Sequence, residues 1–282
     1  MDITFWGTRG SIATAGPSFQ RFGGNTTCIE ITHGAGRIII DAGTGLRGLG
    51  EKLMAEARSL QKKIRASFLF THLHWDHIQG FPFFAPGFRP DTELELFGPS
   101  DESGTLDLEH SLDKQMTPPN FPVPLGAMRA TKVFHTIGDG ATITRDDFSV
   151  KARALTHPQG SLGYRIEAGG KVFCFATDVE HLAEGIDPAL LELARGADLF
   201  VYDAQYTTEE YEGKVGPCRK GWGHSTYAAA AEIAKAAGVK ALGLFHHDPT
   251  HDDAMVEAIE HEARTLFLPT FATREGTTVC LG

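Results

Sequence analysis

Three histidines and an aspartate lie within six residues of one another in the sequence Thr71-His-Leu-His-Trp-Asp-His77. Imidazole and carboxylate groups are the ligands that zinc and similar divalent metals prefer. On a regular helix His72 and His74 would point to different sides, whereas an extended turn lets them converge on one metal. Asp76 and His77 could then serve a neighbouring metal. Two metals about 4 Å apart can share a bridging hydroxide that attacks phosphorus, so the motif predicts a di-metal hydrolase.

Other candidate residues directly follow short apolar stretches that are typical of buried strands. These stretches are 67–71, 150–156, 172–177, 199–202 and 241–245. The residues that follow them are His72, His157, Asp178, Asp203 and His246. We expect strands whose C-terminal ends present these side chains to a single metal centre. His247 comes directly after His246, and the sequence leaves open which of the two is a ligand.

Helix-like segments alternate with the expected strands. The segment 226–237 has Ser225 before it as a candidate N-cap and Gly238 just after it. Two further segments span about 253–266 and 46–63. This alternation predicts a layered α/β architecture with the helices outside.

Residues 101–145 interrupt the alternation. The stretch 116–124 within them contains too many prolines for a helix or a central strand. We therefore expect one domain over residues 1–282, with an inserted lid or interface segment at about 101–145. Phe121 lies in this segment and is a candidate substrate contact, because an aromatic ring can stack on a base. Phenylalanine in such a position more often packs in the core.

The composition is that of a folded globular protein, with 41% hydrophobic and 22% charged residues in 282. No apolar run approaches the roughly 18 residues that span a bilayer, and the start lacks the pattern of a signal peptide. The four cysteines lie far apart, which fits a reducing cytoplasm. The net charge of −10 repels long polyanions. We expect a cytoplasmic protein that binds neither membranes nor long nucleic acids.

The HxHxDH string after an apolar strand resembles the metal motif of the metallo-β-lactamase superfamily. Three further segments, 5–11, 23–26 and 223–226, resemble the branch that holds ribonuclease Z and the cyclic-nucleotide phosphodiesterases. The resemblance extends from the first strand to about His247. It implies a four-layer αββα sandwich, two divalent metal ions (zinc first, with manganese as the alternative) and a homodimer.

The resemblance also implies a role for each candidate residue. One metal would be held by His72, His74 and His157, the other by Asp76, His77 and His246, and Asp178 would bridge the two. His224 would protonate the leaving oxygen, and Asp203 could orient its imidazole and raise its basicity. We count Asp76 among the catalytic residues as well as the ligands. Asp41 is expected to support the metal loop without binding metal.

Charge at such a centre favours phosphodiester hydrolysis. Two divalent cations, two carboxylates and a hydroxide leave a small positive charge, which suits a monoanionic phosphodiester and its more anionic transition state. The short stretch between His157 and Asp178 leaves room for little beyond a hairpin around 167–171, so an arm that grips transfer RNA is absent there. The sequence predicts a small substrate, such as a cyclic nucleotide or another cyclic phosphate. The alternatives are a transfer RNA 3′-processing endonuclease and a non-catalytic, metal-dependent nucleotide-binding protein.

Overall fold

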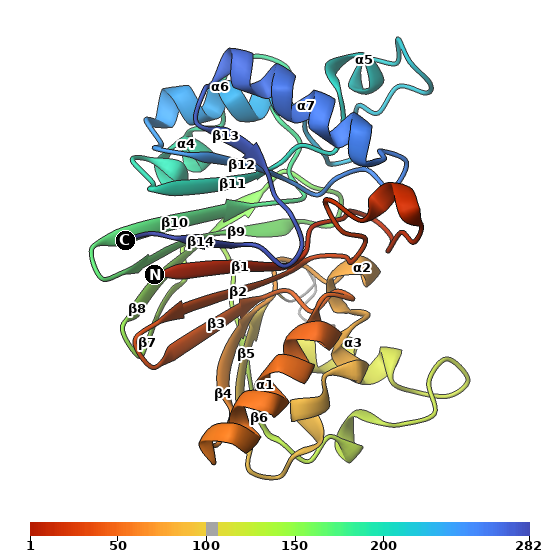
Figure 1. The fold of residues 1–282 in the computed structure, drawn as a ribbon, viewed down its shortest axis with the longest axis vertical. Coiled ribbons are helices and arrows are strands. Elements are labelled where there is room, and N and C mark those ends of the chain that lie inside the picture. The colour runs from red at the N-terminus through yellow and green to blue at the C-terminus, as the bar shows by residue number, and fades with distance from the viewer. Residues whose placement is uncertain (100–106) are drawn as a thin grey trace.

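The computed structural model describes residues 1–99 and 107–282, in which two β-sheets pack face to face between two layers of helices (Figure 1). This is the predicted four-layer αββα sandwich. The candidate lid begins with residues 101–106, which lie outside the described residues.

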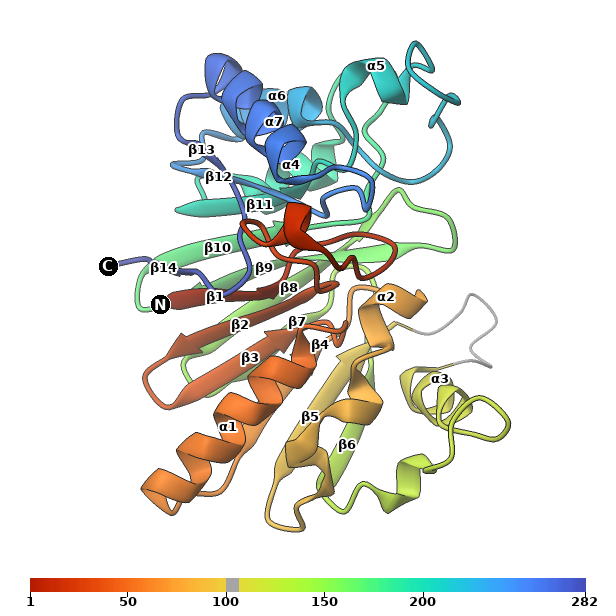
Figure 2. The same ribbon diagram turned by 45° about the vertical axis from the view of Figure 1, so that its right-hand side comes forward.

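The first sheet has seven strands in the order β14-β1-β2-β3-β4-β5-β6. Their bounds are β1 (Asp2–Gly7), β2 (Cys28–His33), β3 (Gly36–Ile40), β4 (Arg65–Leu69), β5 (Glu93–Gly98), β6 (Thr131–Thr136) and β14 (Thr278–Cys280). Strands β3 to β6 run parallel. Helix α1 (Leu46–Leu60) connects β3 to β4 and, with α3 (Leu108–Gln115), covers the outer face (Figure 2).

The second sheet also has seven strands, in the order β13-β12-β11-β10-β9-β8-β7. Their bounds are β7 (Thr142–Arg145), β8 (Phe148–Leu155), β9 (Ser161–Ala168), β10 (Lys171–Ala176), β11 (Leu199–Asp203), β12 (Leu242–Phe245) and β13 (Thr270–Ala272). Strands β10 to β13 run parallel, and β8 shares their direction because β9 is antiparallel to both β8 and β10. The outer face is covered by α4 (Pro188–Ala194), α6 (Tyr227–Ala237) and α7 (Asp253–Leu266).

The central strands are apolar on both faces because each sheet lies between two layers. Ile38 and Ile40 of β3 pack in the core between the sheets, whereas Ile39 faces the α1 side. The same alternation places Phe173 of β10 between the sheets and Cys174 under the helices. Such strands appear in the sequence as continuous apolar runs, which is why they could be predicted.

Two element boundaries differ from the sequence prediction. The N-cap of α6 is Thr226, not Ser225, because the Thr226 side chain accepts the hydrogen bond from the backbone N–H of Ala229 at 3.2 Å. Helix α1 ends at Leu60, and the next residue, Gln61, has the left-handed φ of 51°.

The segment 101–145 is only partly an insertion. The proline-rich stretch 116–124 does lie outside helices and strands, between α3 and a short 3₁₀ helix at Leu125–Ala127. Strands β6 and β7, however, each form the edge of a sheet. In these edge strands exposed residues alternate with buried or partly buried ones, so they do not appear as apolar runs in the sequence.

Five further short helical elements lie in the connections. They are α2 (Trp75–Ile78), α5 (Thr208–Tyr211) and 3₁₀ helices at Pro17–Phe19, Phe81–Phe83 and Ala85–Phe88. Among the described residues, no helix is both long enough and apolar enough to cross a bilayer.

Candidate metal centre

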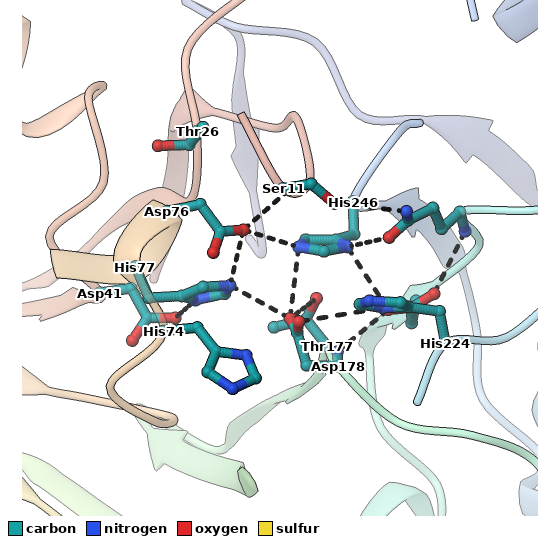
Figure 3. A network of polar contacts seen from close by, with 12 residues as sticks. Ser11, Thr26, Asp41, His74, Asp76, His77, Thr177, Asp178, His224 and His246 are labelled. Carbon is teal, nitrogen blue, oxygen red and sulfur yellow. Dashed lines mark hydrogen bonds and ion pairs between the residues drawn. The ribbon is translucent and has the colours of Figure 1, made fainter. Parts of the chain in front are cut away.

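Side chains from both sheets meet where β4, β8, β10, β11 and β12 end. Figure 3 shows part of this cluster, including Asp76, His77, Asp178 and His246. Asp178 and His246 lie just after β10 and β12 and adopt left-handed φ values of 54° and 64°. Such values are uncommon for residues other than glycine and persist only where the surroundings enforce them. The backbone therefore turns abruptly at the strand ends that present the candidate residues.

Two glycines of the sequence motifs lie against the candidate histidines. A Cβ atom added to Gly10 would lie 2.5 Å from Nδ1 of His246, and one added to Gly223 would lie 2.4 Å from Nδ1 of His157. Both distances are far shorter than van der Waals contact. Glycine at these positions lets the backbone approach the imidazole rings.

The first group of ligand atoms comes from His72, His74 and His157, and these atoms lie within 4.8 Å of one another. Nε2 of His157 is 3.2 Å from Nδ1 of His74. The same Nε2 is 3.8 Å from Oδ1 of Asp178, and Nε2 of His72 is 3.7 Å from that oxygen. Oδ1 of Asp178 therefore faces the first group.

The second group consists of Asp76, His77 and His246. Nε2 of His77 and Nε2 of His246 are each 3.4 Å from Oδ2 of Asp76. They are also 3.3 and 3.4 Å, respectively, from Oδ2 of Asp178. The two oxygens of Asp178 thus face different histidine groups, as a carboxylate that bridges two ions would.

The residues fit two divalent cations. Tetrahedral zinc with ligand bonds of 2.0–2.1 Å places neighbouring ligand atoms about 3.4 Å apart, and several donor separations here are close to that value. Nε2 of His72, His77 and His246 is buried and has no hydrogen-bond partner among the described residues. An unpaired buried nitrogen is costly, and a metal ion at each group would satisfy these atoms.

The carboxylates and imidazoles of the centre shift one another's pKa values. Burial opposes ionisation of Asp76, but the neighbouring His77 and His246 lower the pKa of its carboxyl below the ordinary value. Burial likewise opposes protonation of His77, yet Asp178, Asp76 and Asp41 raise its pKa well above the ordinary value. The carboxylates therefore require positive charge close by, which bound cations would supply.

The outward nitrogen of each buried histidine is held by a second residue. Asp41 accepts hydrogen bonds from Nδ1 of His77 and from the backbone N–H of Thr71, each at 2.8 Å. This is the supporting role predicted for Asp41. Nδ1 of His246 donates to Oε1 of Gln205 at 2.8 Å. These bonds fix the ring orientation and direct Nε2 to the centre.

His224 lies beside the second group and pairs with Asp203. Nδ1 of His224 donates to Oδ2 of Asp203 at 3.0 Å, and its ring stacks on that of His246 with a centroid separation of 4.9 Å. Burial opposes protonation of His224, but Asp203 raises its pKa to about 9. Asp203 therefore favours the imidazolium form of His224, and Nε2 is the atom that could deliver a proton.

The structure distinguishes His246 from His247. His246 belongs to the second group, whereas Nε2 of His247 donates to the backbone carbonyl of Thr273 at 3.0 Å. The ring of His247 packs edge-on against Phe22, and burial lowers its pKa to about 3. His247 is thus a neutral, buried side chain that supports the fold.

Phe121 is placed among packed side chains. It is partly buried against the α1-side core, and its ring meets that of Phe83 edge-on at 5.6 Å. It is not among the described residues that line the pocket beside His72 and His74. Packing against these side chains accounts for the position of the ring, and the role of Phe121 as a substrate contact stays a prediction.

A family model described as the beta-lactamase superfamily domain matches residues 36–247. The chain belongs to the metallo-β-lactamase superfamily. Within it, a ribonuclease Z of Lactococcus lactis is 30% identical over 265 residues, which cover 76% of this chain and 80% of that protein. A ribonuclease BN of Cronobacter sakazakii is 27% identical and covers 95% of each chain. These relatives place the chain in the ribonuclease Z-like branch.

Solved structures agree on the metallo-β-lactamase fold. The crystal structure of human tRNase Z, short form, superimposes with a TM-score of 0.70 at 18% identity and covers 100% of both chains. At this identity the similarity shows the fold alone. The superfamily and the clustered donors together identify the chain as a metal-dependent hydrolase.

Several residues that shape this metallo-β-lactamase centre were not singled out in the sequence. The backbone N–H of Ser11 donates to Oδ2 of Asp76 at 2.8 Å. Gln159 accepts from Nε2 of His74 at 2.9 Å, and the carbonyl of Gly223 accepts from Nδ1 of His157 at 2.8 Å. Ser11 and Gly223 lie in the motifs at 5–11 and 223–226, but single amides such as Gln159 and Gln205 form no sequence pattern.

Proposed function

We propose that this chain is a di-metal phosphodiesterase that hydrolyses a small phosphodiester, such as a cyclic nucleotide or another cyclic phosphate. The observation that supports this most is Asp178, whose two oxygens face two separate groups of histidines. Imidazole and carboxylate donors suit zinc first, with manganese as the alternative. When bound, two such cations supply Lewis-acid stabilisation of phosphoryl oxygens and activate water.

The chain's own residues would supply the proton. In this proposal His224 acts as the general acid and transfers a proton from Nε2 to the leaving oxygen. Asp203 holds the opposite nitrogen, Nδ1, and favours the imidazolium form. Asp203 itself accepts hydrogen bonds from the backbone N–H groups of Ser225 and Asp178, each at 3.0 Å. The same carboxylate therefore holds both the proposed acid, His224, and the backbone of the bridging residue, Asp178.

Two observations support a small substrate. Strands β9 and β10 are joined by the two residues Gly169 and Gly170, so no arm extends between His157 and Asp178. The net charge is −10, which disfavours approach of a long polyanion.

The second candidate is a transfer RNA 3′-processing endonuclease. It is favoured by relatives named ribonuclease Z and ribonuclease BN, which are 30% and 27% identical to this chain. Both candidates use the same metals and acid, so the substrate distinguishes them. A protein that binds nucleotide without hydrolysing it is the non-enzymatic alternative.

The deciding experiment compares substrates on one zinc-loaded preparation, repeated with manganese. The panel contains cyclic mononucleotides, cyclic dinucleotides, cyclic ribose phosphates and precursor transfer RNA, with products identified by mass spectrometry. We expect hydrolysis of a small phosphodiester that is lost with His224→Ala. Efficient cleavage of precursor transfer RNA alone would establish the endonuclease instead. Tight nucleotide binding with two metals and no product would establish the binding protein.

A further inference from the structure

A pocket of about 500 Å³ adjoins the first group of histidines. His72 and His74 form one wall, and the residues just after β6, the end of β8 and the start of β9 contribute to the others. Its volume lies within the range of sites that enclose small organic ligands. The pocket therefore offers space for a part of the substrate directly beside the reacting centre.

The walls of the pocket are mainly apolar. Leu73, Pro99, Ile137 and Leu162 supply hydrocarbon surface. The amide of Gln159 is one of the few polar groups, and its carbonyl oxygen accepts the hydrogen bond from Nε2 of His74 at 2.9 Å. Such a lining binds an apolar ring and orients it through a few polar contacts.

The lining carries no cation. Apart from the two histidines, none of the described residues that line the pocket is ionisable. A second phosphate in this pocket would lose its hydration without a compensating positive charge.

The pocket and the proposed acid lie on different sides of Asp178. In Figure 3, His74 and His224 flank the carboxylate from opposite directions. A phosphodiester at the centre with its leaving oxygen toward His224 would direct its other ester substituent toward His74. The pocket then receives the substituent that stays on phosphorus.

We propose that this pocket is a subsite for an uncharged, largely apolar ring, such as a nucleobase, on the non-leaving side of a single phosphodiester. The inference rests on the proposed function and narrows its substrate class. It excludes substrates that would place a second phosphate in the pocket beside His74.

Gly138 allows the pocket to be filled without disturbing the fold. It lines the pocket, has an ordinary backbone conformation, and a Cβ atom added to it meets nothing within 4 Å. Gly126 shares these last two properties but is not among the described residues lining the pocket. Gly138→Trp is therefore the test variant, and Gly126→Trp is its matched control.

The experiment uses chromogenic esters with one leaving group. Zinc-loaded wild type and both variants are given methyl p-nitrophenyl phosphate, the p-nitrophenyl ester of thymidine 5′-phosphate, and the same thymidine ester with a 3′-phosphate. We expect wild type to prefer the thymidine ester over the methyl ester at least tenfold in kcat/KM, since burying an apolar ring gives a factor of this size. The added 3′-phosphate should remove most of the preference. Gly138→Trp should reduce the preference to about threefold or less, with methyl ester hydrolysis unchanged, while Gly126→Trp retains the preference.

Each possible result either supports or overturns the proposal that this pocket binds an apolar ring. If the esters are hydrolysed but wild type shows no preference, or Gly138→Trp retains it, the subsite is wrong while the proposed function stands. If no ester is hydrolysed, the proposed function fails, and calorimetric binding of thymidine 5′-phosphate decides the subsite separately. Weaker binding to Gly138→Trp than to Gly126→Trp would then support the pocket, and equal binding would overturn it.

Discussion

At the scale of single residues, the centre depends on where each donor atom points. Asp178 faces one histidine group with Oδ1 and the other with Oδ2. His77 and His246 point Nε2 inward because Asp41 and Gln205 hold Nδ1. The motif at 72–77 could be identified from ligand chemistry, and strand ends identified His157, Asp178 and His246. Supporting roles for Asp41 and Asp203 could be predicted, whereas the partners Gln159, Gln205 and the Gly223 carbonyl could not, because a single amide or carbonyl leaves no spacing pattern.

Replacing the bridging carboxylate tests the two-ion arrangement. Asp178→Asn keeps the shape of the side chain but removes its charge, so each histidine group loses an anionic partner. We expect zinc content, measured by mass spectrometry after dialysis, to fall from about two ions per chain to one or fewer.

Asp113→Asn is the control for this variant, because Asp113 is exposed at the end of α3. It should retain the zinc content of wild type. Two tightly held ions in Asp178→Asn would contradict the bridging role.

Removing the proposed acid should separate metal binding from proton transfer. His224→Ala is expected to retain both ions and to lose about 10²–10⁴-fold in kcat toward esters of poor leaving groups. Esters of p-nitrophenolate need no proton and should lose much less. Equal losses for both ester classes, at unchanged metal content, would rule out the acid role.

At the scale of elements, the ends of parallel strands gather residues that are far apart in the sequence. Because β8, β10, β11 and β12 share one direction, their C-terminal ends meet at one edge of the sheet. This could be predicted from apolar runs followed by polar residues. The edge strands β6 and β7 could not, since edge positions are only half buried and lack such runs. The choice between His246 and His247 also needed the structure, because the left-handed turn at His246 sets their directions.

The buried His247 at the end of β12 gives a pH dependence of stability. Its pKa is lowered to about 3 by burial, whereas an unfolded histidine titrates near 6.5. Between these values the unfolded chain binds the additional proton, so the free energy of unfolding falls as pH decreases from 6.5 toward 3, by about 1.4 kcal/mol per pH unit.

Urea denaturation of metal-free protein between pH 7 and 4.5 measures this contribution. His247→Gln can retain a donor toward the Thr273 carbonyl but does not titrate. We expect its stability to decline less steeply with decreasing pH than that of wild type. Parallel pH profiles for the two proteins would refute the assignment of His247 as a neutral buried group.

At the scale of the whole molecule, the sandwich packs two sheets face to face, so that residues from both sheets contribute to one metal centre. The layered architecture could be predicted because the apolar strands and amphipathic helices alternate through most of the chain. The homodimer stays a prediction that sedimentation equilibrium can check. The net charge of −10 acts at this scale too, since it disfavours polyanions at a distance, while the metal centre would attract a single phosphodiester close by.

The central claim is that two cations held by one cluster hydrolyse a phosphodiester. Its most direct test is a zinc titration of chelator-treated protein, in which hydrolysis of bis(p-nitrophenyl) phosphate is followed at each added equivalent. Hydrolysis should rise until two equivalents are bound and then level off. No hydrolysis at any zinc level, with manganese equally ineffective, would contradict the account.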